Sequence, residues 1–154
     1  MAHTEQTIEA YRASVGQGLA ISPWFRIDQS RINSFAEITE DRQAIHVAPE
    51  AVDSLPFGQT IAHGFLTLSL LSAMANSALA PIAGATAAVN YGINNLRFLT
   101  PVRAGSRVRG CFNLRGVRER NPGQWQSVFA VTVEIENEAK PALVAQWLTL
   151  TILT

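Results

Sequence analysis

Residues 35–79 read FAEITEDRQAIHVAPEAVDSLPFGQTIAHGFLTLSLLSAMANSAL, and this stretch decides the fold predicted for the chain. Its last part, from Phe65 to Leu79, contains no charged residue. Apolar residues fall on nearly every side of a 3.6-residue helical wheel, which is typical of a helix surrounded by protein. At roughly 15 residues the run is shorter than a bilayer requires. We therefore predict a buried central helix at about residues 64–80.

The sequence after Thr86 changes from helical periodicity to alternation. Residues 89–98 predict one long strand, and the turn 121–123 (Asn-Pro-Gly) separates two further strands. The alternating sets are Val108, Gly110, Phe112 and Leu114; Phe129, Val131, Val133 and Ile135; and, in a last strand, Val144, Leu148, Leu150 and Ile152. Alternation with short connections predicts antiparallel strands and excludes a parallel sheet with helical crossovers. The fold class is therefore α+β, an antiparallel sheet curled around the central helix.

The segment before the central helix predicts short elements. These are a helix at 3–15, a strand at 24–27, a helix at 30–38 capped by Asp28, a polar loop at 39–47 and a short helix at 49–52. A chain of 154 residues predicts one domain, 1–154, in which residues 1–20 form an N-terminal arm or short helix.

The bulk composition excludes several classes of protein. A hydrophobic content of 47% supports a real core, and a formal net charge of zero gives no case for a nucleic-acid or membrane partner. The single cysteine, Cys111, allows no internal disulfide, and we expect it to be a small buried side chain. The start of the chain has no signal-peptide pattern, so we expect a cytoplasmic protein.

Asp41 and His46 are the first candidates for chemistry. Five residues apart in the predicted loop, a carboxylate and an imidazole can converge on one small molecule such as a water. Histidine is the natural proton carrier near neutral pH, since its reference pKa is ~6.5. The alternative is that Asp41 caps a turn and His46 is an ordinary boundary residue. Spacing alone favours that alternative.

Gly64 opens the predicted central helix. Backbone N–H groups at a helix N-terminus are unpaired and lie at the positive end of the helix dipole, so an oxyanion there would be stabilised. The alternative, equally weighted, is that Gly64 only relieves crowding at a tight junction. The neighbouring His63 is interpreted as a core or supporting residue rather than a catalyst.

Seven arginines and one acidic residue lie between Arg97 and Arg120. Guanidinium groups bind phosphates well, but Arg107 and Arg109 are expected to pair with glutamates across a hairpin. Arg97 and Arg103 have no such explanation. The histidines and the cysteine form no metal-ligand spacing, and the chain has neither a phosphate loop nor a dinucleotide-binding glycine motif.

Three ordered segments resemble the MaoC-like (R)-specific enoyl-CoA hydratases (hydratase 2). They are the hydratase-2 motif, here FAEITEDRQAIH at residues 35–46; IAHGFLTLS at 61–69, entering the central helix; and NYGINNLRF at 90–98, followed by Pro101-Val102. Together they are far more specific than the Asp41/His46 pair. There are three departures: Glu40 replaces a Gly, Gln43-Ala44 replace Asn-Pro, and Ala48 replaces an Asp. The glutamine and the segment after it look most like the nodulation-protein-N-like branch.

The resemblance implies a hot-dog fold, a homodimer, and reversible syn addition of water to a trans-2-enoyl thioester of CoA or of an acyl carrier protein. Asp41 and His46 would activate the water, and the Gly64 N–H would bind the thioester oxygen. Other candidate substrate-binding residues are Gln43, His63, Leu68, Leu71, Ser72, Arg97 and Arg103. The resemblance implies neither a metal nor a redox cofactor, since the thioester itself acidifies C2.

Two other functions remain open at this stage. A hot-dog thioesterase would need a carboxylate on or near the central helix, and the run from Phe65 to Leu79 has none. A non-catalytic acyl-thioester-binding protein is favoured by Glu40, because a charge beside Asp41 would raise its pKa. The sequence gives no acyl chain length, no choice between CoA and carrier protein, and no pathway.

Overall fold

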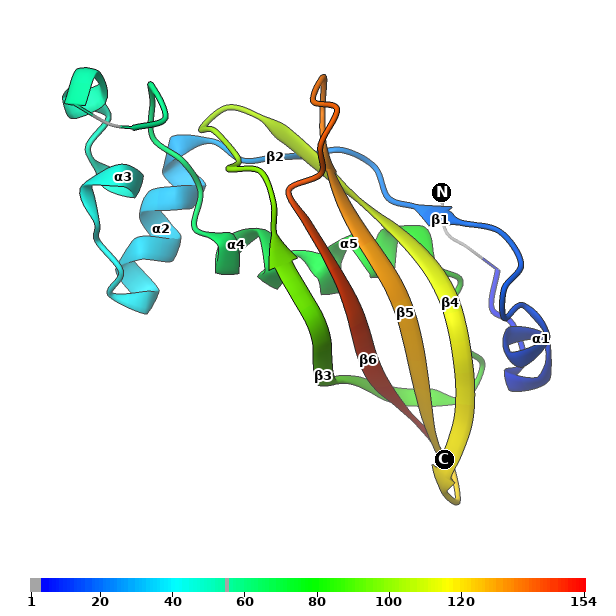
Figure 1. Ribbon diagram of the computed structural model, residues 1–154. Coiled ribbons are helices and arrows are strands. Elements are labelled where there is room, and N and C mark those ends of the chain that lie inside the picture. The colour runs from blue at the N-terminus through cyan, green and yellow to red at the C-terminus, as the bar shows by residue number, and fades with distance from the viewer. Residues whose placement is uncertain (1–3, 55) are drawn as a thin grey trace.

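The structure is a computed structural model that describes residues 4–54 and 56–154. Its centre is an antiparallel sheet of six strands in which the order is β1-β4-β5-β6-β3, with β2 also paired to β4. The strands are β1 (Ala20–Ile21), β2 (Phe25–Arg26), β3 (Ala85–Phe98), β4 (Arg107–Asn121), β5 (Gln124–Ile135) and β6 (Leu143–Leu153). Figure 1 shows the long strands curving across the helical segment that precedes them. The prediction of an α+β fold with an antiparallel sheet is confirmed.

The β4–β5 hairpin follows the predicted alternation. Val108, Phe112 and Leu114 are buried in β4, as are Phe129, Val131, Val133 and Ile135 in β5. Gly110 completes the buried face of β4, where an added Cβ would lie 2.7 Å from the Phe112 ring and 3.1 Å from the Cβ of Met74. The hairpin is therefore shaped to let the central helix pack closely on the sheet.

The face of β6 that enters the core was predicted wrongly. Leu143, Trp147 and Thr151 are buried, whereas the predicted set of even-numbered residues lies half-buried on the opposite face. Both faces of this strand carry large apolar residues, so the apolar pattern does not distinguish them. The Trp147 ring decides the outcome by packing 6.1 Å from the Phe112 ring, centroid to centroid.

The central helix is divided into α4 (Gly64–Ser69) and α5 (Leu71–Ala78), where one continuous helix was predicted over about 64–80. The interruption follows Ser69, whose hydroxyl donates to the Phe65 carbonyl at 2.6 Å, a local bond that bends helices. The helix is also not surrounded on every side within one chain. Its outer flank is open, because Phe65 is 66% exposed and Ser72 is exposed.

The N-terminal half contains α1 (Ile8–Ala13), α2 (Gln29–Thr39), α3 (Ala44–Val47) and a 3-10 helix, η1 (Pro49–Ser54). The predicted cap of α2 is confirmed, since the Asp28 carboxylate accepts from the Arg31 N–H at 2.9 Å. The predicted polar loop at 39–47 is wrong in its second half, which forms α3. The first residues of the helix predicted at 3–15 lie partly outside the described residues, and α1 itself begins at Ile8.

The arm that carries α1 is held against the far end of the central helix. Gln6 donates its N–H to the Pro81 carbonyl at 3.0 Å and accepts from the Ala83 N–H at 2.9 Å. The Tyr11 hydroxyl donates to Ser127 Oγ at 2.9 Å in the buried core. Among the described residues, none of the helices has the length and hydropathy that crossing a membrane would need.

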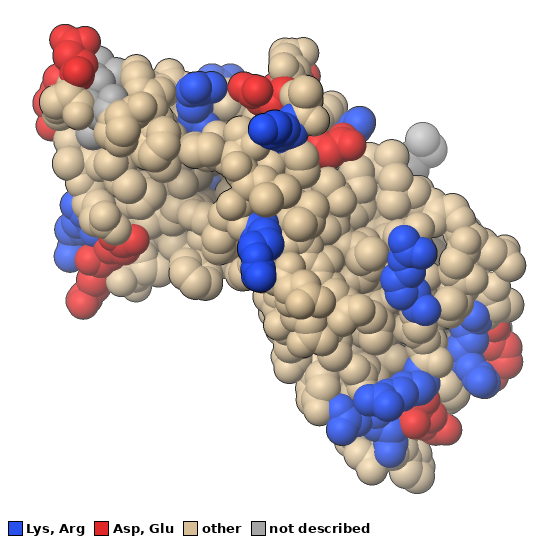
Figure 2. All heavy atoms as spheres, viewed as in Figure 1, with Lys and Arg blue, Asp and Glu red and all other residues tan. Residues whose placement is uncertain are grey.

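Charged side chains of both signs are interspersed on the face shown in Figure 2. The cross-strand pairs expected on the hairpin are present: Arg107 contacts Glu136, and Arg109 Nε lies 2.7 Å from Glu134 Oε2. Arg107 and Arg109 are therefore engaged in cross-strand ion pairs of the hairpin, as expected.

Candidate active site

The site is built where the end of α2, the helix α3 and the segment entering α4 meet. Helix α2 is followed by its C-cap residue Glu40, whose φ of 62° lies in the left-handed region. The chain turns at this residue, and Asp41 is thereby directed toward α3. His46 lies on α3, which is tied to α2 because Gln29 Nε2 donates to the His46 carbonyl at 2.7 Å. The other end of the Gln29 amide accepts from the Thr60 hydroxyl at 2.5 Å. Gln29 therefore joins the His46 backbone to α2 and to Thr60.

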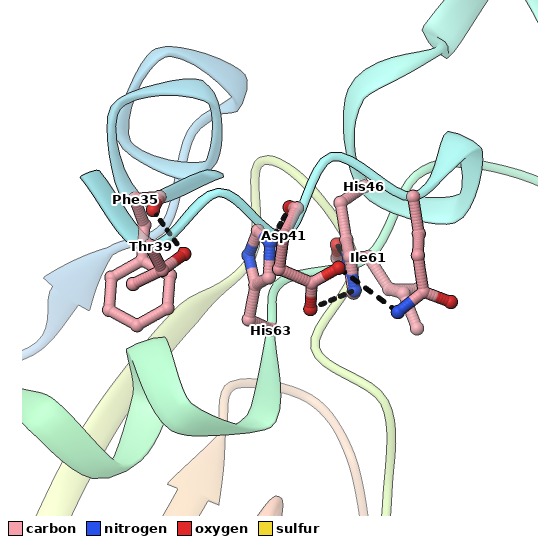
Figure 3. Close-up of polar contacts among 7 residues, drawn as sticks. Phe35, Thr39, Asp41, His46, Ile61 and His63 are labelled. Carbon is pink, nitrogen blue, oxygen red and sulfur yellow. Dashed lines mark hydrogen bonds and ion pairs between the residues drawn. The ribbon is translucent and has the colours of Figure 1, made fainter. Parts of the chain in front are cut away.

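Asp41 and His46 converge as the resemblance implies. Asp41 Oδ2 lies 4.0 Å from His46 Nε2, and Figure 3 shows the two side chains directed at one another. This separation is too long for a direct hydrogen bond. It is the separation that one water would span if it contacted both atoms at ordinary hydrogen-bond distances.

The protonation state of His46 follows from its partners. Its Nδ1 lies 2.7 Å from the Ile61 carbonyl oxygen, which only accepts, so Nδ1 carries the proton and Nε2 presents a lone pair toward Asp41. The ring is 6% exposed. Burial is the main cause that lowers the pKa of His46 below 6.5, and the adjacent His63 lowers it further. His46 is thus a neutral base at neutral pH.

Asp41 is held in its ionised form. The Gln43 side chain donates to Asp41 Oδ1 at 3.0 Å, and this hydrogen bond is the main cause that lowers the pKa of Asp41. The acidic neighbour Glu40 is exposed and is not among the causes of that shift. The objection raised by Glu40 at the sequence level is therefore answered, because Asp41 remains a carboxylate beside it.

His63 was expected to be a core or supporting residue, but the contacts that it makes were not predicted. Its ring is 3% exposed and stacks on the His46 ring, with the centroids 3.7 Å apart and an interplanar angle of 23°. His63 Nε2 lies 2.9 Å from the Asp41 carbonyl oxygen, so it carries the proton and donates. Within the described part of the chain, the buried Nδ1 atom has no hydrogen-bond partner. His63 thus contacts both members of the pair, through one ring face and one ring edge (Figure 3).

Asp41, His46 and His63 also form a group of possible metal ligands, with one atom from each within 4.8 Å of the others. Sequence spacing did not indicate this group. The stacked rings do not suit one ion, however, because imidazole lone pairs lie in the ring planes and these planes are nearly parallel. A metal held about 2.1 Å from both rings would need them to turn toward a common point. The geometry therefore favours a bound water or a shared proton over a metal ion.

The surroundings of Gly64 are compatible with both roles considered for it, relief of crowding and a free N–H donor. An added Cβ would lie 2.9 Å from the nearest ring carbon of Phe98, so glycine does relieve crowding. The Gly64 N–H is in the first turn of α4, and in the described residues it has no acceptor. It follows directly after His63, so this free donor opens the helix at the edge of the histidine stack.

The remaining predicted residues lie in different surroundings. Leu71 is buried in the core, Leu68 is half-buried and Ser72 is exposed. Arg103 is 3.4 Å from Glu138, and Arg97 donates to the Leu96 carbonyl. The structure therefore brings Gln43 and His63 to the Asp41/His46 pair but shows no such contact for the two arginines.

The family model described as MaoC like domain matches residues 10–138. A solved (R)-hydratase from A. caviae, described as involved in PHA biosynthesis, superposes with a TM-score of 0.72 over 88% of this chain and 94% of its own, at 23% identity. That likeness confirms the hot-dog fold. The chain belongs to the MaoC-like family.

Within this family the chain falls in the nodulation-protein-N-like branch. Nodulation protein N of Rhizobium leguminosarum bv. viciae is 52% identical over 138 residues, covering 88% of this chain and 85% of the relative. The 3-hydroxyacyl-thioester dehydratase Z of Mycobacterium tuberculosis is 43% identical over 143 residues, covering 93% and 94%. The relatives thus include both a nodulation protein and a protein named as a dehydratase.

Proposed function

We propose that this protein is an (R)-specific enoyl-thioester hydratase, equally able to run as a 3-hydroxyacyl-thioester dehydratase. The observation that carries the proposal is the 4.0 Å gap between the Asp41 carboxylate and the unprotonated Nε2 of His46. A neutral base and a fixed carboxylate facing the same small space are what water activation requires. The substrate class follows the family, whose named members include dehydratases of 3-hydroxyacyl thioesters.

In this proposal His46 Nε2 takes a proton from the bound water while the water oxygen forms a bond to C3 of the enoyl thioester. The C2–C3 π electrons move toward the thioester oxygen, where the Gly64 N–H binds the developing negative charge. The proton then passes from His46 to C2 on the same face, which completes syn addition and restores the neutral imidazole. Asp41 stays ionised and orients the water throughout.

The alternatives have less support. A thioesterase would need a carboxylate on the central helix, and α4 and α5 carry none. A binding protein without catalysis does not require that His46 be kept neutral and aimed at Asp41. No metal or redox group enters the proposed reaction.

A hydration assay on crotonyl-CoA tests the proposal, by following the loss of enoyl-thioester absorbance. We expect Asp41→Asn and His46→Gln each to lower kcat/KM by roughly 10²–10⁴, the usual contribution of a positioned acid or base. Glu37→Gln is the matched control, since Glu37 is an exposed partner of Arg42 beside the site. If folded wild-type protein hydrates no enoyl thioester, the hydratase proposal is wrong and a non-catalytic acyl-thioester-binding protein becomes the better interpretation.

We also propose that the protein is a homodimer joined through β3. Among the described residues this strand pairs only with β6, so its other edge presents backbone groups that no described strand pairs. Large apolar side chains are exposed along it and beside it, at Val89, Tyr91, Ile93, Phe98, Leu99 and Phe65. Sedimentation equilibrium should give twice the chain mass, and Ile93→Lys should shift it toward the monomer. A wild-type monomer at micromolar concentration would contradict the pairing.

A further inference from the structure

The β4–β5 hairpin carries arginines near both of its ends, and only those at the open end are paired with glutamates. Near the turn, β4 carries Arg115, Arg118 and Arg120, and none of them has an ion-pair partner among the described residues. The acidic residue between them, Glu119, instead accepts from the Gly123 N–H at 2.9 Å. Figure 2 shows basic side chains gathered at this end of the molecule. Their charges are therefore not engaged in ion pairs within the described chain.

Two of these arginines converge on one buried atom. Arg118 donates to Gln126 Oε1 from Nε at 3.2 Å and from Nη2 at 3.0 Å, and Arg120 Nη1 donates to the same oxygen at 3.4 Å. Gln126 is 3% exposed. Because Ser127 and Phe129 point into the core, the alternation along β5 places Gln126 on the face of the sheet that points away from the central helix. A neutral, buried oxygen thus holds two cationic groups side by side on that outer face.

Tyr91 of β3 holds the second guanidinium group from another side. The Arg120 guanidinium carbon lies 4.8 Å from the centroid of the Tyr91 ring, and Arg120 Nη1 donates to the Tyr91 hydroxyl. Among the described residues, Arg118 Nη1 and the Nε and Nη2 atoms of Arg120 have no acceptor. The two guanidinium groups are therefore positioned by neutral partners while part of their donor capacity stays free.

We propose that Arg118 and Arg120 form a binding site for the phosphate group of a small organic phosphate. Two neighbouring guanidinium groups repel one another, and an anion that contacts both relieves this repulsion. Each group presents a planar fork of N–H donors that matches phosphate oxygens. A carboxylate has two oxygens in one plane and suits one fork, whereas phosphate oxygens point in several directions and can reach both. Gln126 and Tyr91 position the forks in advance, so less side-chain freedom is lost on binding.

This phosphate site is separate from the candidate active site. Figure 1 shows the turn of the β4–β5 hairpin and the helices α2 and α3 at opposite ends of the molecule. The site also stays accessible in the proposed dimer, because pairing of β3 edges uses backbone groups and leaves the outer face of the sheet open. Its occupation should therefore stabilise the fold without changing the rate of hydration.

Calorimetric titration of the full chain with inorganic phosphate and with adenosine 5′-monophosphate, at constant ionic strength, tests the proposal. We expect Arg118→Gln and Arg120→Gln each to weaken binding roughly 10–100-fold, the usual contribution of a hydrogen bond to a charged group. Arg107→Gln is the matched control, since it removes the same charge from the same strand where the arginine is paired with Glu136. Tighter binding of the nucleotide would identify a nucleotide ligand, and equal binding would show that the phosphate group alone is recognised.

Three outcomes would overturn the phosphate site. The first is a urea-unfolding midpoint that phosphate raises no more than chloride does. The second is phosphate binding that Arg107→Gln weakens as much as Arg118→Gln, because general charge attraction would then explain it. The third is a glutamate-rich peptide that binds these arginines without competition from phosphate, since the partner would then be an acidic protein segment.

An activity measurement keeps this test apart from that of the proposed function. Because distant sites act independently, crotonyl-CoA hydration by Arg118→Gln and Arg120→Gln should stay within about twofold of wild type. A larger fall in either folded variant would contradict a site separate from the candidate active site. Phosphate binding by a protein that hydrates no enoyl thioester would overturn the hydratase and support the phosphate site.

Discussion

The two ends of the central helix are organised by different forces. At the Gly64 end, His46 and His63 are buried and each ring donates one N–H to a backbone carbonyl. At the Leu79 end, a cavity of about 680 Å³ is lined mostly by apolar side chains, and Tyr11 in its lining donates to Ser127. Hydrogen bonds to backbone carbonyls position the rings at the first end, whereas apolar packing dominates at the second. Substitutions at the first end should change the rate, and those at the second end should change stability.

The largest effect that would sharpen this comparison is expected at His63. His63→Phe keeps a stacked ring but loses the bond to the Asp41 carbonyl. We expect kcat to fall by roughly 10–100-fold on short and long substrates alike, or about 1.4–2.7 kcal/mol. Since His63 also lowers the pKa of His46, the acid limb of the pH–rate profile should move to higher pH. Phe35→Leu, which alters the ring packed 5.0 Å from His63, is the control. An unmoved acid limb would indicate a packing role only.

The second effect is the pH dependence of the Gly64 end. The folded pKa of His46 lies below its unfolded value of about 6.5, so the unfolded chain takes up a proton first as the pH falls. The stability contributed by neutral His46 should therefore be complete above about pH 6.5 and be lost as the pH falls through the folded pKa. Activity should decline over the same window. Urea unfolding between pH 5 and 8 should show this slope in wild type and lose it in His46→Gln.

Sequence patterns predicted the parts of the fold that depend on local repetition. The alternation in β4 and β5, the turn between them and the Asp28 cap each arise from neighbouring residues. The division of the central helix after Ser69 was missed, and no local pattern predicts it, because the same kind of serine bond from Ser34 to the Ser30 carbonyl leaves α2 unbroken. The buried face of β6 was missed because both faces are apolar, so only packing against Phe112 decides between them.

The sequence allowed the reacting pair of the candidate site to be predicted, but not the residues that hold this pair in position. Motif resemblance placed Asp41 and His46 together, and the structure brings them within 4.0 Å. The stacking of His63 on His46 joins residues far apart in sequence, and spacing carries no signal for such a contact. The same holds for Gln29, which lies before the motif and whose amide joins the His46 carbonyl of α3 to the Thr60 hydroxyl. Contacts made by the tertiary fold have no periodic trace in the sequence.

A smaller effect is expected at the Leu79 end, in stability rather than rate. Burial raises the pKa of Tyr11 to about 12, so its hydroxyl stays protonated and donates to Ser127. Tyr11→Phe leaves the buried Ser127 hydroxyl unpaired, which should cost about 1–3 kcal/mol of unfolding free energy. Adding Ser127→Ala should recover part of that loss. Crotonyl-CoA turnover should not change, and Arg12→Gln on the same helix is the control. Equal losses of activity and stability would break the separation of the two ends.

The smallest effect concerns the turn that directs Asp41 toward His46. Glu40 has a φ of 62°, where a side chain costs about 1–2 kcal/mol, and the family motif has glycine at this position. Glu40→Gly relieves that strain but adds freedom to the unfolded chain, worth roughly 0.5–1 kcal/mol, so a net gain of at most about 1.5 kcal/mol is expected. Asn137→Gly is the matched control, because Asn137 has a φ of 63° and asparagine tolerates that region better. Urea unfolding should therefore show a larger gain at Glu40 than at Asn137. If Glu40→Gly instead lowers kcat without adding stability, the strained turn itself holds Asp41 in position, and directional control at this end extends to the backbone.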